Sequence, residues 1–288
     1  MTDKAPKTKA PAIQSPSPAD EAGVSCKTRF LCALQSTGRV GKSTAIQSLA
    51  SYLDFAGVPW AGVDADPEHR TFSSAFPNVA HFPLSTPENL DQIFRHADTA
   101  PVSLVDFPAG STETILDHLK RRQVLVGFSE RGVRMTVLLF ASPDPTAEAS
   151  FRAVFATLKG QVDFILVQND ARFSSARFAG SPAAKALAEL GAPTVMLPAL
   201  SSLSLREVAQ AEGKLRRRLP LAEARQHVGT DSRLDLDYFT NHVWAQWEEY
   251  ADLIVPDAKL ILHRLERAVE PASATGAAYD EFADPLDL

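Results

Sequence analysis

One run of small and hydroxyl residues near the N-terminal end has the pattern of a phosphate-binding loop. The segment Ser36–Thr44 ends in Gly-Lys-Ser-Thr and follows the short apolar run Phe30–Leu34. In such loops the backbone N–H groups surround the α- and β-phosphates, a lysine reaches the β- and γ-phosphates, and the next hydroxyl binds Mg²⁺. Lys42 and Ser43 occupy these positions, and Gly41 lets the backbone approach phosphate closely. The strict pattern begins with glycine where this chain has serine, so the neighbouring segments must support the assignment.

Acidic residues follow two further apolar runs in the order that a nucleotide-binding site requires. Pro59–Val63 leads directly into Asp64 and Asp66, and Val102–Val105 leads into Asp106. Because the carboxyl ends of parallel strands meet at one edge of a sheet, we expect these carboxylates to lie near the phosphate-binding loop. There they can hold Mg²⁺ through water and orient an attacking water.

Apolar periodicity predicts an α/β fold with a doubly wound, mostly parallel sheet. Residues 45–53 have helical spacing, and Gly57 has the position of a residue that ends a helix. Further along, helical patterns alternate with strand patterns, which is typical of parallel βαβ units. The expected strands are 133–141, 162–167 and 194–197, and the expected helices are centred on 90–94 and 115–119 or span 147–158 and 183–190.

Composition fits a globular domain with extensions. The 288 residues are 45% hydrophobic and 22% charged, which is ordinary for such domains. We expect a disordered tail at 1–25, a nucleotide-binding domain at 26–215, a C-terminal helical extension at 216–270 and an acidic disordered tail at 271–288. The apolar runs are shorter than the roughly 20 residues of a membrane span, and no secretory signal is evident. Cys26 and Cys32 lack metal or redox spacing, so we expect a cytoplasmic protein.

The three ordered motifs resemble those of the ParA/MinD family of P-loop ATPases, the deviant-Walker-A group that includes plasmid and chromosome partition proteins. Gly38–Thr44 is similar to the family loop, Val63–Glu68 to its Asp-x-Asp-Pro-Gln segment, and Asp106–Gly110 to its Asp-x-Pro-Ala-Gly segment. The resemblance covers about residues 28–215 and implies a P-loop fold with ATP and Mg²⁺ as cofactors. It also implies a switch that controls a nucleotide-dependent homodimer, or association with DNA or a partition or transfer protein.

The resemblance also assigns roles to individual residues. Lys42 would bind phosphate, Ser43 and Asp106 would serve Mg²⁺ with support from Asp64, and Asp66 would position the hydrolytic water. The rest of the nucleotide-binding loop consists of residues that contribute mainly their backbone: Gly38, Arg39, Val40, Gly41 and Thr44.

Two positions of the loop depart from the family pattern. The signature lysine, which touches the phosphates of a dimer partner, falls on Thr37, and the second glycine falls on Arg39. A neutral hydroxyl cannot replace a cation beside transferring phosphate, so hydrolysis is weak or another cation substitutes. Arg39 is the candidate substitute and therefore a candidate catalytic residue; alternatively it is an exposed loop arginine.

The loop after the strand at 162–167 is where this superfamily contacts the base. A guanine-specific Asn-Lys-x-Asp would place an acid at position 172, but the chain has Arg172, which favours ATP over GTP. Asn169 is the candidate adenine contact, with Pro198 and the loop after it as the other wall. The alternative is that Asn169 only caps the turn that follows it.

The C-terminal part carries two features of undecided use. Lys214 and Arg216–Arg218 could bind the phosphates of DNA or anionic lipid, or could form a solvated helix end. Between 231 and 254, Phe239, Val243, Trp247 and Ile254 form one helical stripe. Packing against the core is its default use, and a docking surface is the alternative.

Three classes of function remain at this stage. The first is a ParA/MinD-like ATP-dependent switch with weak ATP hydrolysis, supporting plasmid or DNA partition or conjugative transfer. The second is an ATP-dependent adaptor that does not hydrolyse ATP, a reading that Thr37 favours. The third is a P-loop kinase or ligase for small metabolites, which the two acidic motifs match less well.

Overall fold

The computed structural model describes residues 25–35, 37–142, 144–171, 180, 182–189, 191–257 and 261. Its centre is one sheet of seven strands in the order β3-β2-β4-β1-β5-β6-β7, and every pair of neighbours is parallel. The strands are β1 (Thr28–Ala33), β2 (Trp60–Asp64), β3 (Val79–His81), β4 (Val102–Asp106), β5 (Val133–Phe140), β6 (Asp163–Asn169) and β7 (Thr194–Leu197). The predicted α/β class and doubly wound sheet are confirmed, and the seven described strands are parallel throughout.

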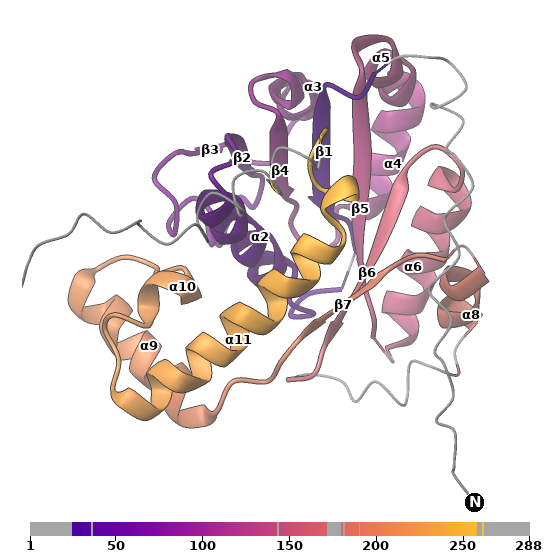
Figure 1. Cartoon of the computed structure of the whole chain (residues 1–288). Helices are drawn as coiled ribbons and strands as arrows, with labels where there is room; N and C mark the ends of the chain where they lie inside the picture. Colours follow the sequence, from indigo (N-terminus) through magenta and orange to yellow (C-terminus); the bar gives the residue numbers. More distant parts are fainter. Residues whose placement is uncertain are drawn as a thin grey trace, which may run out of the picture.

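Helices cover both faces of the sheet (Figure 1). They are α2 (Lys42–Ala56), α3 (Pro87–Arg95), α4 (Thr112–Arg121), α5 (Val124–Arg131), α6 (Pro145–Leu158), α8 (Pro182–Glu189), α9 (Ser202–Leu215), α10 (Leu221–Ala224) and α11 (Thr230–Glu249), with short 3₁₀ helices η1 (His96–Asp98) and η2 (Ala251–Leu253). Alternate residues of β1 enter opposite layers, because successive strand side chains point to opposite faces. Leu31 packs with α2 and α11, whereas Phe30 packs with α3, α4, α5 and α6.

The end of α2 agrees with the sequence pattern, whereas the end of α11 differs from it. Gly57 ends α2 in the left-handed conformation (φ 64°), as predicted. The C-terminal stripe is confirmed for Phe239, Val243 and Trp247, which are buried on α11. However, α11 ends at Glu249, and the buried Ile254 lies beyond η2 instead of on the same helix. Trp247 Nε1 donates to Ser48 Oγ at 3.3 Å, so this stripe packs on α2, its default use.

The C-terminal helices form a small unit with its own apolar cluster. Val208 and Ala211 of α9 pack with Leu219, with Ala224 of α10 and with Leu236 of α11. The expected domain boundary at 215/216 thus falls between helices that pack together. Residues 1–24 and 262–288, which contain most of both expected tails, lie outside the described residues.

Among the described helices, none combines the length and apolar character needed to cross a membrane. Cys26 and Cys32 both carry free thiols, and Cys32 is fully buried in β1.

Candidate functional site

The predicted phosphate-binding loop connects the end of β1 to the start of α2. α2 begins at Lys42, directly after Gly41, which as the N-cap residue has no side chain to cap the first N–H groups. Uncapped N–H groups at a helix start point outward and attract anions, aided by the helix dipole. Since β1 lies between β4 and β5 in the sheet, the loop opens at the edge where the parallel strands end. The structure thus places the loop where a nucleotide phosphate would bind in a doubly wound fold.

Gly41 is required by the backbone and by the space around it. Its φ of 106° lies in the region that favours glycine, and an added Cβ would come within 2.6 Å of Asn169 Nδ2. The Asn169 amide donates to the carbonyl oxygen of Val40 at 3.2 Å. β6 therefore helps to fix the conformation of the loop.

Lys42 lies inside the loop and close to two carboxylates. Its Nζ donates to the carbonyl oxygen of Thr37 at 2.8 Å. Burial lowers the pKa of Lys42, and the nearby charges of Asp106 and Asp66 act in the opposite direction. The structure thus brings together the lysine and the two acids that the sequence predicted to meet at this edge.

Ser43 and Asp106 form the candidate magnesium position. The Ser43 side chain lies close enough to the carboxyl of Asp106, which is buried at the end of β4, to influence its pKa. Burial raises the pKa of Asp106 to about 7, and the neighbouring Asp64 and Asp66 add to this effect, whereas Ser43 and Lys42 oppose it. Desolvation of this carboxyl favours its neutral form, and a cation would favour the charged form.

A hydroxyl and a carboxylate are oxygen ligands that suit Mg²⁺. Among the described residues, no group of three or more histidine, cysteine or acidic side chains could hold a metal by itself. Mg²⁺ keeps several waters and commonly takes one or two protein ligands together with substrate phosphates. The residues present therefore fit a phosphate-bound Mg²⁺.

Asp64 organises the loop that follows β2. Its Oδ2 accepts from the N–H groups of Phe72 and Ser73, at 2.9 and 2.8 Å, and from Ser73 Oγ at 3.1 Å. Its Oδ1 accepts from the N–H of Asp66 at 3.1 Å. In register Asp64 pairs with Asp106 across β2 and β4, so it lies beside the candidate metal position while its oxygens hold the loop.

Asp66 is half-buried, and one of its oxygens is available. Oδ1 accepts from the N–H groups of Glu68 and His69, at 2.8 and 2.9 Å, which is an Asx-type turn. No hydrogen bond to Oδ2 is present among the described residues. The carboxylate is therefore held in position with one oxygen able to accept from a water.

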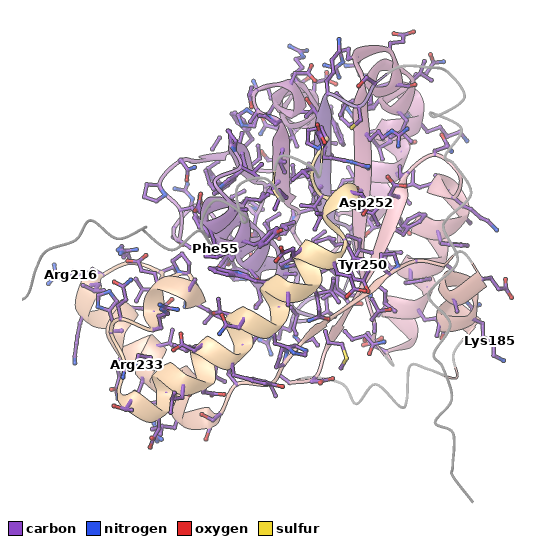
Figure 2. The ribbon with its side chains drawn as sticks, viewed as in Figure 1. Phe55, Lys185, Arg216, Arg233, Tyr250 and Asp252 are labelled. Carbon is purple, nitrogen blue, oxygen red and sulfur yellow. The ribbon has the colours of Figure 1, made fainter. Side chains whose placement is uncertain are left out.

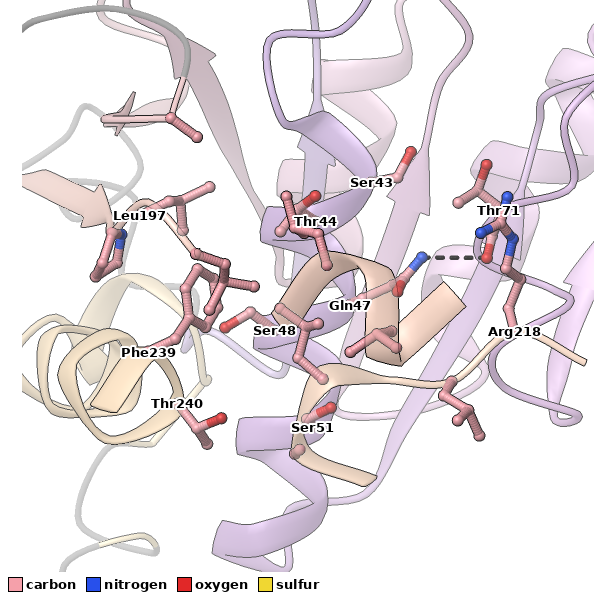
Figure 3. Close-up of a pocket in the computed structure, with 18 of the residues that line it drawn as sticks. Ser43, Thr44, Gln47, Ser48, Ser51, Thr71, Leu197, Arg218, Phe239 and Thr240 are labelled. Carbon is pink, nitrogen blue, oxygen red and sulfur yellow. Dashed lines mark hydrogen bonds between the residues drawn. The ribbon is translucent and has the colours of Figure 1, made fainter. Parts of the chain in front are cut away.

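The candidate base contacts line a cavity of about 360 Å³. Its lining includes Thr44, Asn169 and Pro198, and the close-up in Figure 3 labels Thr44 and Leu197 among the lining side chains. Asn169 Oδ1 accepts from the N–H of Ala171 at 3.1 Å, so the turn-capping interaction exists. Arg172, on which the preference for ATP rests, lies outside the described residues.

The two positions that depart from the family pattern differ in environment. Arg39 is exposed and holds a left-handed conformation with φ 61°. Thr37 Oγ1 is buried and has no hydrogen-bond partner among the described residues. Arg39 is accessible to a molecule that approaches the loop from outside, whereas the Thr37 hydroxyl is not.

Half of the basic cluster at 214–218 is neutralised by neighbouring acids. Arg217 pairs with Glu223, and Arg218 pairs with Glu212 at 2.7 Å. Arg216 is exposed at the turn after α9 (Figure 2). The cluster therefore presents less free positive charge than its sequence suggests.

Gln35 is a positioning residue that sequence analysis missed. It is buried, and its Oε1 accepts from the N–H of Phe140 at 2.9 Å, which ties the start of the loop to β5. The available signal was a polar residue directly after the apolar run Phe30–Leu34.

The sheet and loop together define an α/β protein of P-loop NTPase-like architecture. No protein-family model matches the chain, and no curated protein matches its sequence. Similar solved structures include the septum site-determining protein MinD of Pyrococcus horikoshii with Mg-ADP, at 16% identity and a TM-score of 0.48, covering 77% of this chain and 96% of that one.

The MinD cell division protein of Aquifex aeolicus aligns at 12% identity and a TM-score of 0.44, covering 73% and 95% of the two chains. The signal recognition particle receptor FtsY of Elizabethkingia anophelis, in complex with GDP, aligns at 13% and 0.39, covering 68% and 59%. These identities and scores are too low to carry an argument about function, which must come from the site itself.

Proposed function

We propose that this chain binds Mg²⁺-ATP at the loop between β1 and α2. The observation that carries the proposal is the juxtaposition of Ser43, Asp106 and Lys42 at the carboxyl edge of a parallel sheet. A cationic side chain, a hydroxyl–carboxylate pair and uncapped helix N–H groups are together complementary to a metal-bound polyphosphate.

Each group would have a defined task. Lys42 would exchange its hydrogen bond to the Thr37 carbonyl for the β- and γ-phosphates, while Ser43 and Asp106 would hold Mg²⁺ directly or through water. Bound Mg²⁺ would supply charge neutralisation at the phosphates. Asp66 would orient the attacking water through its available oxygen, and Asp64 would fix the loop that carries Asp66. Asn169 and Pro198 would flank the adenine.

We further propose that the nucleotide acts as a switch in a ParA/MinD-like manner, supporting plasmid or DNA partition or conjugative transfer. This role rests on the three motifs and their order in the sequence. A nucleotide-dependent homodimer would bring phosphate contacts from a second chain to the loop, where Arg39 is exposed. The paired state of Arg217 and Arg218 favours a protein partner over DNA at that cluster.

Hydrolysis of ATP to ADP and phosphate is expected to be weak, and one observation favours the adaptor as a second candidate. The buried hydroxyl of Thr37 stands where the family has a lysine, so no charge from that position reaches a partner's phosphates. An adaptor would bind Mg²⁺-ATP through the same residues without turning it over.

Calorimetric titration with ATP, in the presence and absence of Mg²⁺, tests the metal assignment. We expect wild-type affinity to depend on Mg²⁺, and we expect Ser43→Ala and Asp106→Asn to lose that dependence. Ser129→Ala, an exposed serine on α5, is the matched control. ATP binding that is indifferent to Mg²⁺ in the wild type would contradict the proposed site.

A further inference from the structure

The cavity beside the phosphate-binding loop is lined by residues from two parts of the fold. α2 contributes Ser43 and Thr44, which belong to the proposed nucleotide site, and also Gln47, which lies one helical turn further on. The segment between α9 and α10 contributes Arg218 to the same cavity. Figure 3 shows Arg218 on the same side of α2 as Thr71, which also lines the cavity. A side chain from the C-terminal helices therefore borders the proposed nucleotide site.

Arg218 is the only cation among the described residues that line this cavity. The other charged residue in the lining is Glu212, whose Oε2 pairs with Arg218 at 2.7 Å. A triphosphate keeps negative charge after it has bound Mg²⁺, and Lys42 can neutralise only part of that charge. Because a guanidinium forms strong charge-assisted hydrogen bonds with phosphate oxygens, Arg218 has the chemistry to neutralise more of it.

The ion pair with Glu212 holds the Arg218 side chain without burying it. The Arg218 side chain is 60% exposed, whereas that of Glu212 is 15% exposed. Glu212 has a second contact, because its Oε1 accepts from the N–H of Leu219 at 3.0 Å. Exposed ion pairs contribute little to stability, so Arg218 can exchange Glu212 for a phosphate at small cost. Glu212 stays in place through its contact with Leu219.

The backbone that carries Arg218 is fixed on both sides. On one side, Arg216 ends α9 in the left-handed conformation with φ 54°, and the N–H of Arg217 donates to the carbonyl oxygen of Glu212 at 3.2 Å. On the other side, Leu219 is buried in the apolar cluster that joins α9, α10 and α11. Arg218 can therefore reach a ligand by a change of side-chain rotamer, without a rearrangement of the turn.

We propose that Arg218 binds the phosphate chain of the nucleotide, as a cation that the C-terminal helices supply to the site. The guanidinium leaves Glu212 when Mg²⁺-ATP binds and returns to it when the nucleotide dissociates. This inference rests on the proposed function, since it requires a nucleotide held by Lys42 and Ser43. It adds a cation from outside the phosphate-binding loop, and it couples nucleotide binding to the turn between α9 and α10.

Arg217 offers a matched control for a test of Arg218. The two arginines are adjacent and each pairs with a glutamate, but Arg217 is not among the residues that line the cavity. In calorimetric titrations of Mg²⁺-ATP into the full-length chain, Arg218→Ala should weaken binding about threefold to tenfold. Arg217→Ala should bind as the wild type does. Arg218→Lys should recover part of the affinity, because it keeps the positive charge.

Two further measurements separate a phosphate contact from an effect on folding. The difference in affinity between the wild type and Arg218→Ala should shrink when the salt concentration rises from about 0.05 M to about 0.5 M, because salt screens a contact made by an exposed charge. Without nucleotide, the melting temperature of Arg218→Ala should match that of Arg217→Ala, since each variant loses one exposed ion pair.

Three results would overturn the inference and leave the proposed function intact, as long as Lys42→Ala binds Mg²⁺-ATP more weakly than the wild type. They are wild-type affinity in Arg218→Ala, an equal loss of affinity in Arg217→Ala, and a loss in Arg218→Ala that salt does not change. If the wild type does not bind Mg²⁺-ATP, or binds it no better than Lys42→Ala, the proposed nucleotide site is itself wrong and the role of Arg218 is refuted with it.

Discussion

The substitution Gly41→Ala tests how the phosphate-binding loop is held. Gly41 has φ 106°, and the added methyl carbon would lie 2.6 Å from Asn169 Nδ2. The substitution therefore reduces the free energy of unfolding in two ways. The backbone must leave a conformation that alanine rarely adopts, and the Asn169 amide must move away from the added methyl group. Either adjustment displaces the first N–H groups of α2, and the second breaks the hydrogen bond from Asn169 to the Val40 carbonyl.

The two costs have comparable sizes. An unfavourable backbone conformation costs about 1–3 kcal/mol, and inserting a methyl group into filled space costs about 1–3 kcal/mol. We therefore expect Gly41→Ala to lower the free energy of unfolding by roughly 2–6 kcal/mol, a large share of the ~5–15 kcal/mol of a typical domain. Nucleotide affinity should fall as well, since the loop can no longer present its N–H groups together.

Urea denaturation, combined with calorimetric titration of Mg²⁺-ATP, measures both effects. Gly127→Ala is the matched control, because Gly127 lies within α5 and an added Cβ would have no neighbour within 4 Å. That variant should be stabilised by about 0.5–1 kcal/mol. In the double variant Gly41→Ala/Asn169→Ala the steric cost disappears but the backbone cost remains, so the two changes should not be additive.

The reasoning would be refuted by a Gly41→Ala protein of wild-type stability and nucleotide affinity. If the changes in the free energy of unfolding caused by Gly41→Ala and Asn169→Ala simply added in the double variant, only the predicted steric clash with Asn169 would be refuted.

The remaining predictions concern turnover, association and pH. Asp66→Ala should retain ATP but lose turnover, because the water loses its orienting carboxylate; single-turnover hydrolysis at the wild-type rate would remove Asp66 from the mechanism. Thr37→Lys should raise hydrolysis or tighten an ATP-dependent dimer, and Arg39→Ala should weaken both; sedimentation with and without ATP decides, and a dimer indifferent to Arg39→Ala would eliminate Arg39. Burial lowers the pKa of His118 from 6.5, so protonation opposes folding and the free energy of unfolding should fall as the pH drops below 6.5. The variant His118→Gln should lose the part of this pH dependence that comes from protonation of His118. If urea denaturation gave the same pH dependence of the free energy of unfolding for both proteins, the prediction for His118 would be wrong.

The parallel sheet was predictable because its central strands contain short, mostly apolar runs. β1, β4 and β5 are almost entirely buried, which parallel strands between two helix layers require, and their sequences show it directly. The short β3 was not predicted, since Val79–His81 has neither the length nor the pattern of an independent strand. It forms because Gly62–Asp64 of β2 offers an edge for it to pair with, which is tertiary information.

The sequence predicted which residues lie close together at the site. It did not predict what each of these residues contacts. Strand ends identified Asp64, Asp66 and Asp106 alike, because a carboxylate after an apolar run has the same pattern in all three cases. Their surroundings differ: Asp64 accepts the hydrogen bonds that fix the loop after β2, while Asp106 is buried near Ser43 and Lys42.

The basic cluster shows a similar limit. Lys214 to Arg218 is a run of positive charge in sequence, but the fold pairs Arg217 with Glu223 of α10 and Arg218 with Glu212 of α9. Sequence reasoning counts charges, whereas the structure shows which of them are neutralised.

Titration of Mg²⁺-ATP into the wild type and Lys42→Ala by calorimetry tests the central claim most directly. Lys42 is the loop cation that lies beside Asp106 and Asp66, so removing it should weaken binding by about 2–3 kcal/mol, the size of a lost charge-assisted hydrogen bond. Lys120→Ala, on the opposite layer in α4, is the control and should bind as the wild type does. Equal affinity of wild type and Lys42→Ala for Mg²⁺-ATP would contradict a phosphate-binding role for this loop.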